Sequence, residues 1–409
     1  MKSLYMLENP IQPYPWGSTD GICKFTGIQN PDHRPMAELW MGAHPGASSR
    51  IASLAAGETV SLESFIAESP VETLGKECVE RFGRKLPFLF KVLSAAHPLS
   101  LQVHPSKQQA HEGFLRENGH IPLFSPERNY KDDNHKPELL MALEHFVGLC
   151  GFRPPRETAE LFSRLQDSEL RDAADILSNT ASYTDFLSRL FNVTDAEKNR
   201  TIASVKRSAK AFSETDATPR DRYVWQLVNE FASQYPLDSG ILAPLFLNLV
   251  ILEPGEAIYI PTGVMHSYIR GTGLELMAVS DNVLRCGLTP KHVDTRELLS
   301  ILEPSPYTPG ILNPSVSNGA AIYRTPCSEF QLSVIDTRTE SAAITANTPS
   351  ICIVAEGELN VETTDGEACT IHKGTSFFIP ASGNEIRFGR SGILYRADVP
   401  LEKGADLTC

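Results

Sequence analysis

The chain has 409 residues, of which 41% are hydrophobic and 21% are charged, so it is long and apolar enough to form roughly two or three domains. Its 37 Lys and Arg residues are outnumbered by 50 Asp and Glu residues, which gives a formal net charge of -13. This balance argues against nucleic acid as a partner, because binding nucleic acid needs a basic surface that releases counterions.

The cysteine pattern and the hydropathy indicate a cytoplasmic protein with no membrane partner. The eight cysteines are scattered and none forms a Cys-x-x-Cys pair, as is typical of free thiols in a reducing compartment. No signal peptide is predicted, because Glu8, Asn9 and Pro10 interrupt the N-terminus before any long apolar run develops. No stretch approaches the ~20 apolar residues that a membrane-spanning helix needs.

The first part of the chain predicts strands mixed with short helices. Residues 61–82 have helical character and begin with a serine that can cap a helix. Residues 86–93 form a short apolar run with the length and flanks of a buried strand. Residues 98–105 predict another strand, in which Gln102 and His104 point to the same face because side chains in a strand repeat with a period of two.

Residues 152–240 are predicted to form an α-helical insert. Between residues 157 and 235, apolar side chains recur at the spacing of amphipathic helices, as in Leu161, Phe162 and Leu165. Glycine is absent from this stretch and charged residues separate the apolar positions. Both features favour helices over strands.

Short strands joined by Pro and Gly turns return after the insert and continue to the C-terminus. This pattern of short strands and turns favours an antiparallel sandwich or jelly roll. Residues 255–261 and 374–380 share the pattern Gly-x-x-apolar-x-Ile-Pro, which indicates two sheet domains of the same kind. Residues 381–385 follow the second copy without a histidine, whereas His266 follows the first, so the second domain is predicted to lack a metal site.

Four polar residues in these segments are candidate ligands of one divalent metal ion. Gln102 and His104 are followed by Glu138 and then by His266. A site of one amide, two imidazoles and one carboxylate contains no thiolate. Because structural zinc sites rely on cysteine, this set of ligands indicates a catalytic zinc site.

The same segments resemble the type I mannose-6-phosphate isomerases of the cupin superfamily. The resemblance depends on residues 102–105, 136–138, 260–266 and 280–291, with further likeness at residues 14–17 and 37–45. It implies a mainly β fold with an α-helical insert, built from two cupin-like jelly-roll domains and a helical domain. We expect a discontinuous catalytic cupin domain at residues 1–151 and 241–305, the helical insert at 152–240, and a C-terminal cupin-like domain at 306–409.

The resemblance also implies an activity and the residues that perform it. The family interconverts mannose 6-phosphate and fructose 6-phosphate through a cis-enediolate, with one Zn²⁺ held here by Gln102, His104, Glu138 and His266. Further residues are implied in catalysis, namely Arg285, Glu275, Lys136 and Asp281. Others are expected to contact the substrate, namely Lys91, Ser100 and His135.

Aldose–ketose isomerisation explains why such residue types are needed. A divalent cation stabilises the negative charge that develops on the substrate oxygens. A base must carry a proton between C2 and C1, and Glu275, Asp281, His135 and Lys136 all stay open for this role. The phosphate needs cations at the far end of the site, where Arg285, Lys136 and Lys91 are the candidates.

Two alternative functions stay open at this point. A metal-dependent cupin oxygenase would use two histidines and one carboxylate with open positions, but the fourth ligand Gln102 and the basic residues argue against it. A catalytically inactive sugar-phosphate-binding cupin would not need the complete ligand set or Arg285. We expect a monomer that acts on a small sugar phosphate, and the sequence leaves open whether it serves mannose catabolism or the synthesis of GDP-mannose.

Overall fold

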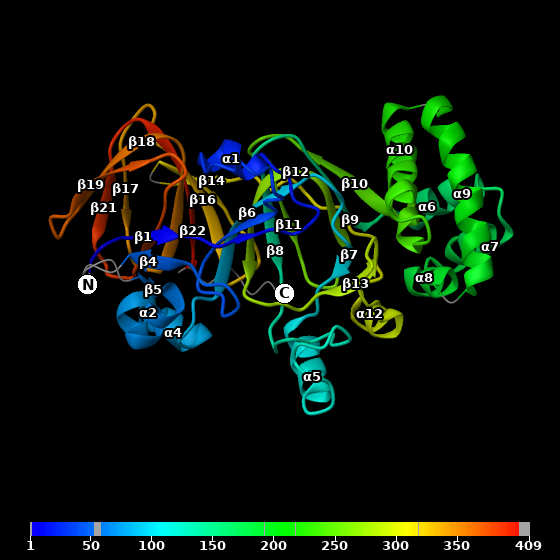
Figure 1. Ribbon diagram of the computed structural model, residues 1–409, viewed down its shortest axis with the longest axis horizontal. Coiled ribbons are helices and arrows are strands. Elements are labelled where there is room, and N and C mark those ends of the chain that lie inside the picture. The colour runs from blue at the N-terminus through cyan, green and yellow to red at the C-terminus, as the bar shows by residue number, and fades with distance from the viewer. Residues whose placement is uncertain (1, 53–58, 192, 217, 318, 401–409) are drawn as a thin grey trace.

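The computed structural model describes residues 2–52, 59–191, 193–216, 218–317 and 319–400. Two β-sheet bodies lie side by side, and a bundle of helices projects from the end of one of them (Figure 1). The predicted mainly β architecture with two sheet domains and a helical insert is confirmed.

The first sheet body has ten strands and contains the predicted metal ligands. Its main path runs through β10 (Leu247–Leu252), β9 (Phe146–Phe152), β12 (His266–Ala278), β6 (Phe88–Ala95), β3 (Glu38–Met41) and β2 (Ile11–Gln12). Off this path lie β7 (Leu101–Val103), β8 (Glu138–Ala142), β11 (Ala257–Ile260) and β13 (Leu284–Gly287). The strand predicted at residues 86–93 is therefore confirmed as β6.

The long strand β12 joins the two faces of this first sheet body. Its first half pairs with β9 and β7, and its second half pairs with β6 and β8. The register shifts between Tyr268 and Arg270, next to Gly271 with a φ of 117°. A glycine is needed there because an added Cβ would lie 2.8 Å from the carbonyl oxygen of His145. The bend lets β12 present polar side chains from both halves to one interior.

The second sheet body has twelve strands. Nine come from the C-terminal part of the chain: β14 (Ser315–Ser317), β15 (Ala320–Tyr323), β16 (Gln331–Asp336), β17 (Ala342–Thr345), β18 (Ser350–Thr363), β19 (Ala368–His372), β20 (Ser376–Ile379), β21 (Glu385–Phe388) and β22 (Gly392–Asp398). Three come from the N-terminal part: β1 (Tyr5–Glu8), β4 (Arg50–Ala52) and β5 (Thr59–Ser61). β1 pairs with β20, so the N-terminal segment completes the C-terminal sheet.

One apolar cluster joins the two sheet bodies. Leu39, Phe88 and Leu274 of the first body belong to the same buried cluster as Phe330 and Phe378 of the second. The outer face of the first sheet is therefore covered by protein. This explains why all eight residues of β6 are buried and why its sequence does not alternate between apolar and polar residues.

Short helices cover the sheets and a longer set forms the insert. The helical character of residues 61–82 is confirmed, but Pro70 and Gly75 divide it into α2 (Leu62–Glu68), α3 (Pro70–Leu74) and α4 (Lys76–Phe82). The other helices outside the insert are α1 (Gly21–Thr26), α5 (Lys107–Glu117), the 3₁₀ helix η1 (Ser239–Leu242), α11 (Ala243–Phe246) and α12 (Thr295–Ile301).

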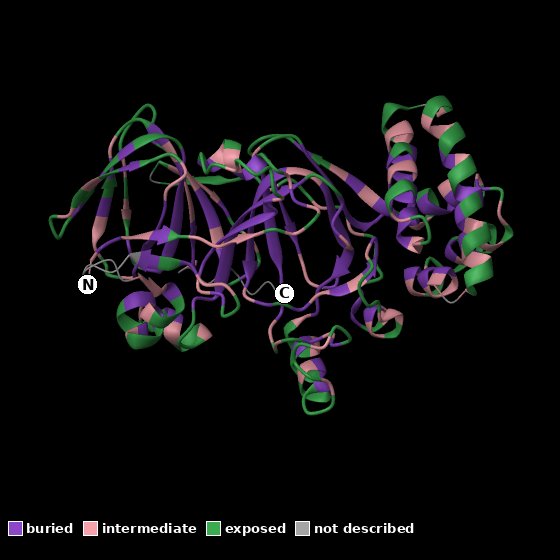
Figure 2. Cartoon of the chain, in the orientation of Figure 1, coloured by how far each residue is buried: buried purple, intermediate pink, exposed green. Residues whose placement is uncertain are grey.

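The insert consists of α6 (Pro155–Ser163), α7 (Ser168–Thr180), α8 (Tyr183–Phe191), α9 (Asp195–Thr215) and α10 (Pro219–Gln234). Each of these helices buries one side and exposes the other (Figure 2). The stacked rings of Phe152 and Tyr183, 4.1 Å apart, attach the bundle to the end of β9.

Among the described residues, no helix is both long and apolar enough to span a membrane. Seven cysteines within them are free thiols, whereas Cys409 lies outside the described residues.

Candidate metal centre

Three buried side chains from different elements meet inside the first sheet body. His104 follows β7, Glu138 begins β8 and His266 begins β12. Their ligand atoms all lie within 4.8 Å of one another. Nε2 of His104 lies 3.3 Å from Oε1 of Glu138, and Nε2 of His266 lies 3.2 Å from Oε2. Two imidazoles therefore face one carboxylate.

Gln102 joins this group through the strand register. It lies directly opposite His266 in the pairing of β7 with β12, and residues directly opposite each other in an antiparallel pair point to the same face of the sheet. Gln102 is buried, with 9% of its surface exposed. The strand alternation predicted from the sequence thus directs an amide towards the two imidazoles and the carboxylate.

Backbone carbonyl groups determine which ring nitrogen of each imidazole is available. Nδ1 of His104 lies 2.7 Å from the carbonyl oxygen of Asn282, and Nδ1 of His266 lies 2.9 Å from that of Val264. A carbonyl oxygen only accepts a hydrogen bond, so each Nδ1 bears a proton, and in the neutral ring Nε2 keeps a lone pair. Within the described residues both Nε2 atoms are buried without a hydrogen-bond partner.

These lone pairs fit a divalent cation. A lone pair and a carboxylate about 3 Å apart repel each other unless a positive charge lies between them. Imidazoles whose Nδ1–H donates to a backbone carbonyl have the arrangement that zinc-binding histidines use. Gln102, His104, Glu138 and His266 would hold the ion.

Neighbouring charges keep the ligands in their metal-binding forms. Burial, together with the positive charge of Lys136, lowers the pKa of His104 to about 4, so its ring is neutral near pH 7. Burial opposes ionisation of Glu138, but opposing effects led by the positive charge of Lys136 hold the pKa of this carboxyl well below its usual range. The hydroxyl of Tyr268 lies 3.2 Å from Oε2 of Glu138 and donates to it.

Alternating charges continue along the same interior. Nζ of Lys136 lies 2.9 Å from Oε1 of Glu138, as a charge contact without the geometry of a hydrogen bond. Nζ of Lys91 lies 2.7 Å from Oε2 of Glu275 and 3.6 Å from Oε1 of Glu38. These five groups are buried. Three carboxylates face two ammonium groups, and the excess negative charge also favours a bound cation.

Arg285 enters this interior from β13 and belongs to a group of three cations. It lies opposite Gln102 in the pairing of β13 with β7, so its side chain points to the ligand face. Burial lowers its pKa, and no carboxylate of the described residues forms an ion pair with it. Burial and then the positive charges of Arg285 and Lys131 lower the pKa of Lys291. Lys131 and Lys291 are themselves exposed.

Three further residues expected at the site are Asp281, His135 and Ser100. Oδ1 of Asp281 lies 3.3 Å from Nε2 of His44, and 47% of the Asp281 side chain is exposed. Nε2 of His135 lies 2.7 Å from Oε1 of Glu329, which belongs to the second sheet body. Ser100 is half-buried directly before β7. The structure brings the remaining expected residues together, namely Gln102, His104, Glu138, His266, Lys91, Lys136, Glu275 and Arg285.

Sequence reasoning missed several residues around the site. They are Glu38, Lys131, Tyr268, Asn282 and Lys291. Glu38, Asn282 and Lys291 fall inside segments that carried the resemblance, so a closer reading of those segments offered a signal. Lys131 lies outside them, in a segment without strand or helix periodicity.

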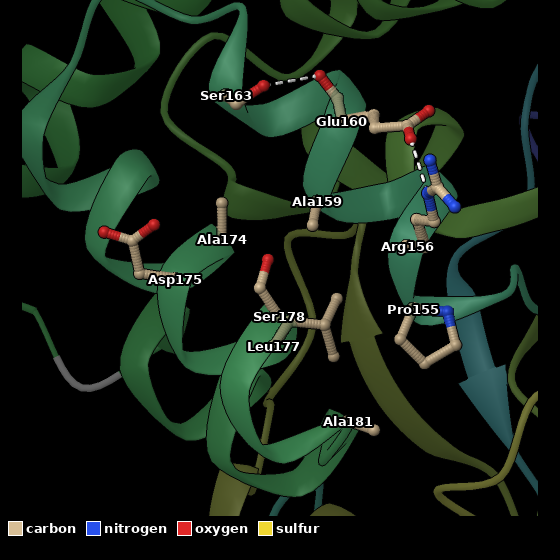
Figure 3. A pocket seen from close by; sticks show the side chains of 10 residues that line it. All are labelled: Pro155, Arg156, Ala159, Glu160, Ser163, Ala174, Asp175, Leu177, Ser178 and Ala181. Carbon is tan, nitrogen blue, oxygen red and sulfur yellow. Dashed lines mark hydrogen bonds and ion pairs between the residues drawn. The ribbon is translucent and has the colours of Figure 1, made fainter.

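A surface groove lies away from this centre, between α6 and α7 of the insert. Its volume is about 570 Å³, and its lining is mostly small or apolar, with Ala159, Ala174 and Leu177 between charged side chains (Figure 3). Nε of Arg156 donates to Oε1 of Glu160 at 2.9 Å, which satisfies two of those charges. The groove contains no grouping comparable to the metal ligands among the described residues.

Comparisons with known proteins agree over nearly the whole chain. Residues 4–155 match the catalytic domain of the type I phosphomannose isomerases. The mannose-6-phosphate isomerase of Salmonella typhimurium is 39% identical over 394 residues, which cover 95% of this chain and 98% of that protein. The human mannose-6-phosphate isomerase is 31% identical over 410 residues, covering 93% of this chain and 94% of that protein. A solved, zinc-bound mannose 6-phosphate isomerase superposes with a TM-score of 0.89 at 37% identity, covering 98% and 100% of the two chains.

Replacing His104 by alanine is expected to remove the bound metal. The variant loses one of the two imidazole ligands, so zinc per chain falls to a small fraction of the wild-type content. Elemental analysis of dialysed protein measures this content. The control is His372→Ala, because His372 is exposed on β19 of the second sheet body. Retention of the full zinc content by His104→Ala would contradict the assignment.

Proposed function

The chain belongs to the type I phosphomannose isomerase family, and we propose that its metal centre interconverts mannose 6-phosphate and fructose 6-phosphate. The family and the cupin-type fold agree with the prediction from the sequence. The supporting observation is that the ligand group His104, Glu138 and His266 shares one interior with a buried Lys–Glu pair and with Arg285. The enzyme is a zinc-dependent aldose–ketose isomerase with one ion per chain.

The ligand set suits this cofactor. When bound, zinc acts as a Lewis acid that stabilises negative charge on the reacting oxygens of the sugar. Gln102 and the two imidazoles are neutral ligands, so Glu138 is the single anionic one and the site keeps net positive charge. The backbone carbonyls of Asn282 and Val264 hold the imidazoles in their orientations, and the hydroxyl of Tyr268 does the same for the carboxylate.

Glu275 is the group best placed to move a proton between C2 and C1. Burial raises the pKa of its carboxyl, while Lys91 at 2.7 Å opposes that effect. A raised pKa brings the carboxyl closer to the range in which it accepts and returns a proton near neutrality. Asp281 is the weaker candidate, since it is paired with His44 at the exposed rim.

The cations have two separate tasks. Lys136 lies beside Glu138 and can stabilise negative charge near the metal. Arg285, Lys131 and Lys291 form a group of cations, and within the described residues Arg285 has no carboxylate partner. We propose that this group holds the phosphate of the substrate. Binding energy from the phosphate then orients the reacting carbons.

Neither of the alternative functions is favoured. Gln102 supplies a fourth ligand position that a two-histidine, one-carboxylate oxygenase does not need. An inactive sugar-phosphate-binding protein would not need the buried Lys91–Glu275 pair and the complete ligand set.

We also propose the division of the chain given above. The catalytic domain comprises residues 1–151 and 241–305, the helical domain 152–240, and the C-terminal domain 306–409, with β1, β4 and β5 added to the sheet of the last. We propose that the enzyme is a cytoplasmic monomer without a nucleic-acid or membrane partner. The free cysteines and the formal charge of -13 support this proposal.

The activity is tested by a coupled assay on mannose 6-phosphate with and without a chelator. We expect fructose 6-phosphate to form, the rate to fall as zinc is removed, and the rate to return when zinc is added back. Full activity in zinc-free protein would contradict the proposed mechanism. Binding of the sugar phosphate without turnover would favour the inactive alternative, and oxygen consumption would favour the oxygenase.

Replacing Arg285 by alanine is expected to reduce kcat/KM for mannose 6-phosphate by about a hundredfold or more, because a positioned cation is lost from the interior. Arg285→Lys should recover only part of this loss, since an ammonium group does not reproduce the bidentate guanidinium. Steady-state kinetics measure both variants, with zinc content as the control for the metal centre. Wild-type kinetics in Arg285→Ala would remove this residue from the active site.

A further inference from the structure

We propose that Asn282 is a positioning residue that holds the segment 131–134 at a fixed distance from the metal ligands. The inference rests on the proposed function, because this segment contains Lys131 of the cation group that we assign to the phosphate. Asn282 lies between three parts of the site: the imidazole of His104, the segment 131–134, and β13 with Arg285.

The side chain of Asn282 is fully buried and uses both ends of its amide. Its Oδ1 accepts from the backbone N–H groups of Lys131 at 2.7 Å and Asp132 at 3.2 Å. Its Nδ2 donates to the backbone carbonyls of Asp132 at 2.8 Å and Asn134 at 2.9 Å. Residues 131–134 form neither helix nor strand, so this single amide replaces the pairing that regular structure would give their backbone.

The main chain of Asn282 contacts the metal centre at the same time. Its carbonyl oxygen lies 2.7 Å from Nδ1 of His104 and fixes the tautomer of that ligand. Because the carbonyl persists in every variant at this position, the two functions of Asn282 can be separated. Changing the side chain removes its hydrogen bonds to the segment 131–134 but leaves the hydrogen bond to His104 in place.

The side chain of Asp132 provides a second connection, which ties the segment 131–134 to residues 280 and 281. Its carboxylate accepts from the hydroxyl of Ser280 at 2.8 Å and from the backbone N–H of Asp281 at 2.7 Å. The backbone N–H of Lys131 donates to Asn282, whereas the carbonyl of Asn134 also accepts from the hydroxyl of Ser280 at 3.1 Å and its N–H donates to the carboxylate of Asp132 at 3.0 Å. We therefore expect the segment to remain attached in Asn282 variants but to lose the exact placement of Lys131.

The consequence concerns the binding of the phosphate. A sugar phosphate reaches from the metal to the cation group, so the spacing between His104 and Lys131 decides whether both ends are held together. If Asn282 sets this spacing, replacing its side chain lowers the affinity for the phosphate and leaves the affinity for zinc unchanged.

The test compares Asn282→Ala and Asn282→Asp with wild type, all loaded with zinc. We expect KM for mannose 6-phosphate and the inhibition constant of inorganic phosphate to rise together by about tenfold or more, with zinc content unchanged. Asn282→Asp keeps the accepting oxygen but loses the donor and places a carboxylate against two carbonyls, so it should not restore wild-type values. Asn282→Ser replaces Asn282→Ala if the latter does not fold.

Two further variants separate positioning from a general loss of stability. Asn248 donates to the carbonyls of Gly151 and Tyr307 at 3.0 and 2.8 Å, and it thus holds backbone outside the site. Asn248→Ala should lower Tm and leave KM unchanged. In a double-mutant cycle, Asn282→Ala should add little to the KM of Lys131→Ala. The first change misplaces the charge of Lys131, and the second removes that same charge.

The outcomes distinguish this inference from the function on which it rests. If wild type does not convert mannose 6-phosphate, the proposed function fails. If wild type is active and Asn282→Ala keeps wild-type KM and phosphate inhibition, or loses zinc in proportion to its rise in KM, the positioning role is refuted. Additive effects of Asn282→Ala and Lys131→Ala would refute it as well.

Discussion

The site depends on the repulsion between two imidazole lone pairs and one buried carboxylate. Backbone carbonyls force the protons of His104 and His266 onto Nδ1, so both Nε2 atoms present lone pairs to Glu138 at 3.3 and 3.2 Å. A metal cation bound between them turns this arrangement from unfavourable to favourable. The lowered pKa of His104 and the lowered pKa of Glu138 keep both groups in the forms that bind a metal ion.

The fold supplies the rigidity that this constraint requires. The bent strand β12 brings His266 and Glu275 into one interior, although they lie on halves that pair with different strands. The second sheet body covers the outer face of the first through a shared apolar cluster. That cover keeps water from the outside of the sheet and strengthens the charge pairs on its inside, since their effective dielectric constant is lowered. The second sheet body thus contributes to the surroundings of the site through packing.

Local sequence patterns predicted much of this arrangement. The period of two in residues 98–105 placed Gln102 and His104 on one face, and helical periodicity identified the insert. The contact of His135 with Glu329 joins segments far apart in the chain and has no such local pattern. Pairing between distant segments has no local signature, which is why the joining of β1 to β20 was not foreseen. The group of Arg285, Lys131 and Lys291 was not predicted for the same reason, because Lys131 and Lys291 are far apart in the sequence and influence each other only in the folded chain.

Anomalous X-ray diffraction at the zinc absorption edge, from crystals of the zinc-loaded enzyme, tests the central claim most directly. The account predicts one strong peak per chain, about 2.0–2.2 Å from Nε2 of both histidines and from carboxylate oxygen of Glu138, with Gln102 completing the coordination. Zinc located elsewhere, or bound through Nδ1 of either ring, would contradict the arrangement from which the proposed chemistry follows.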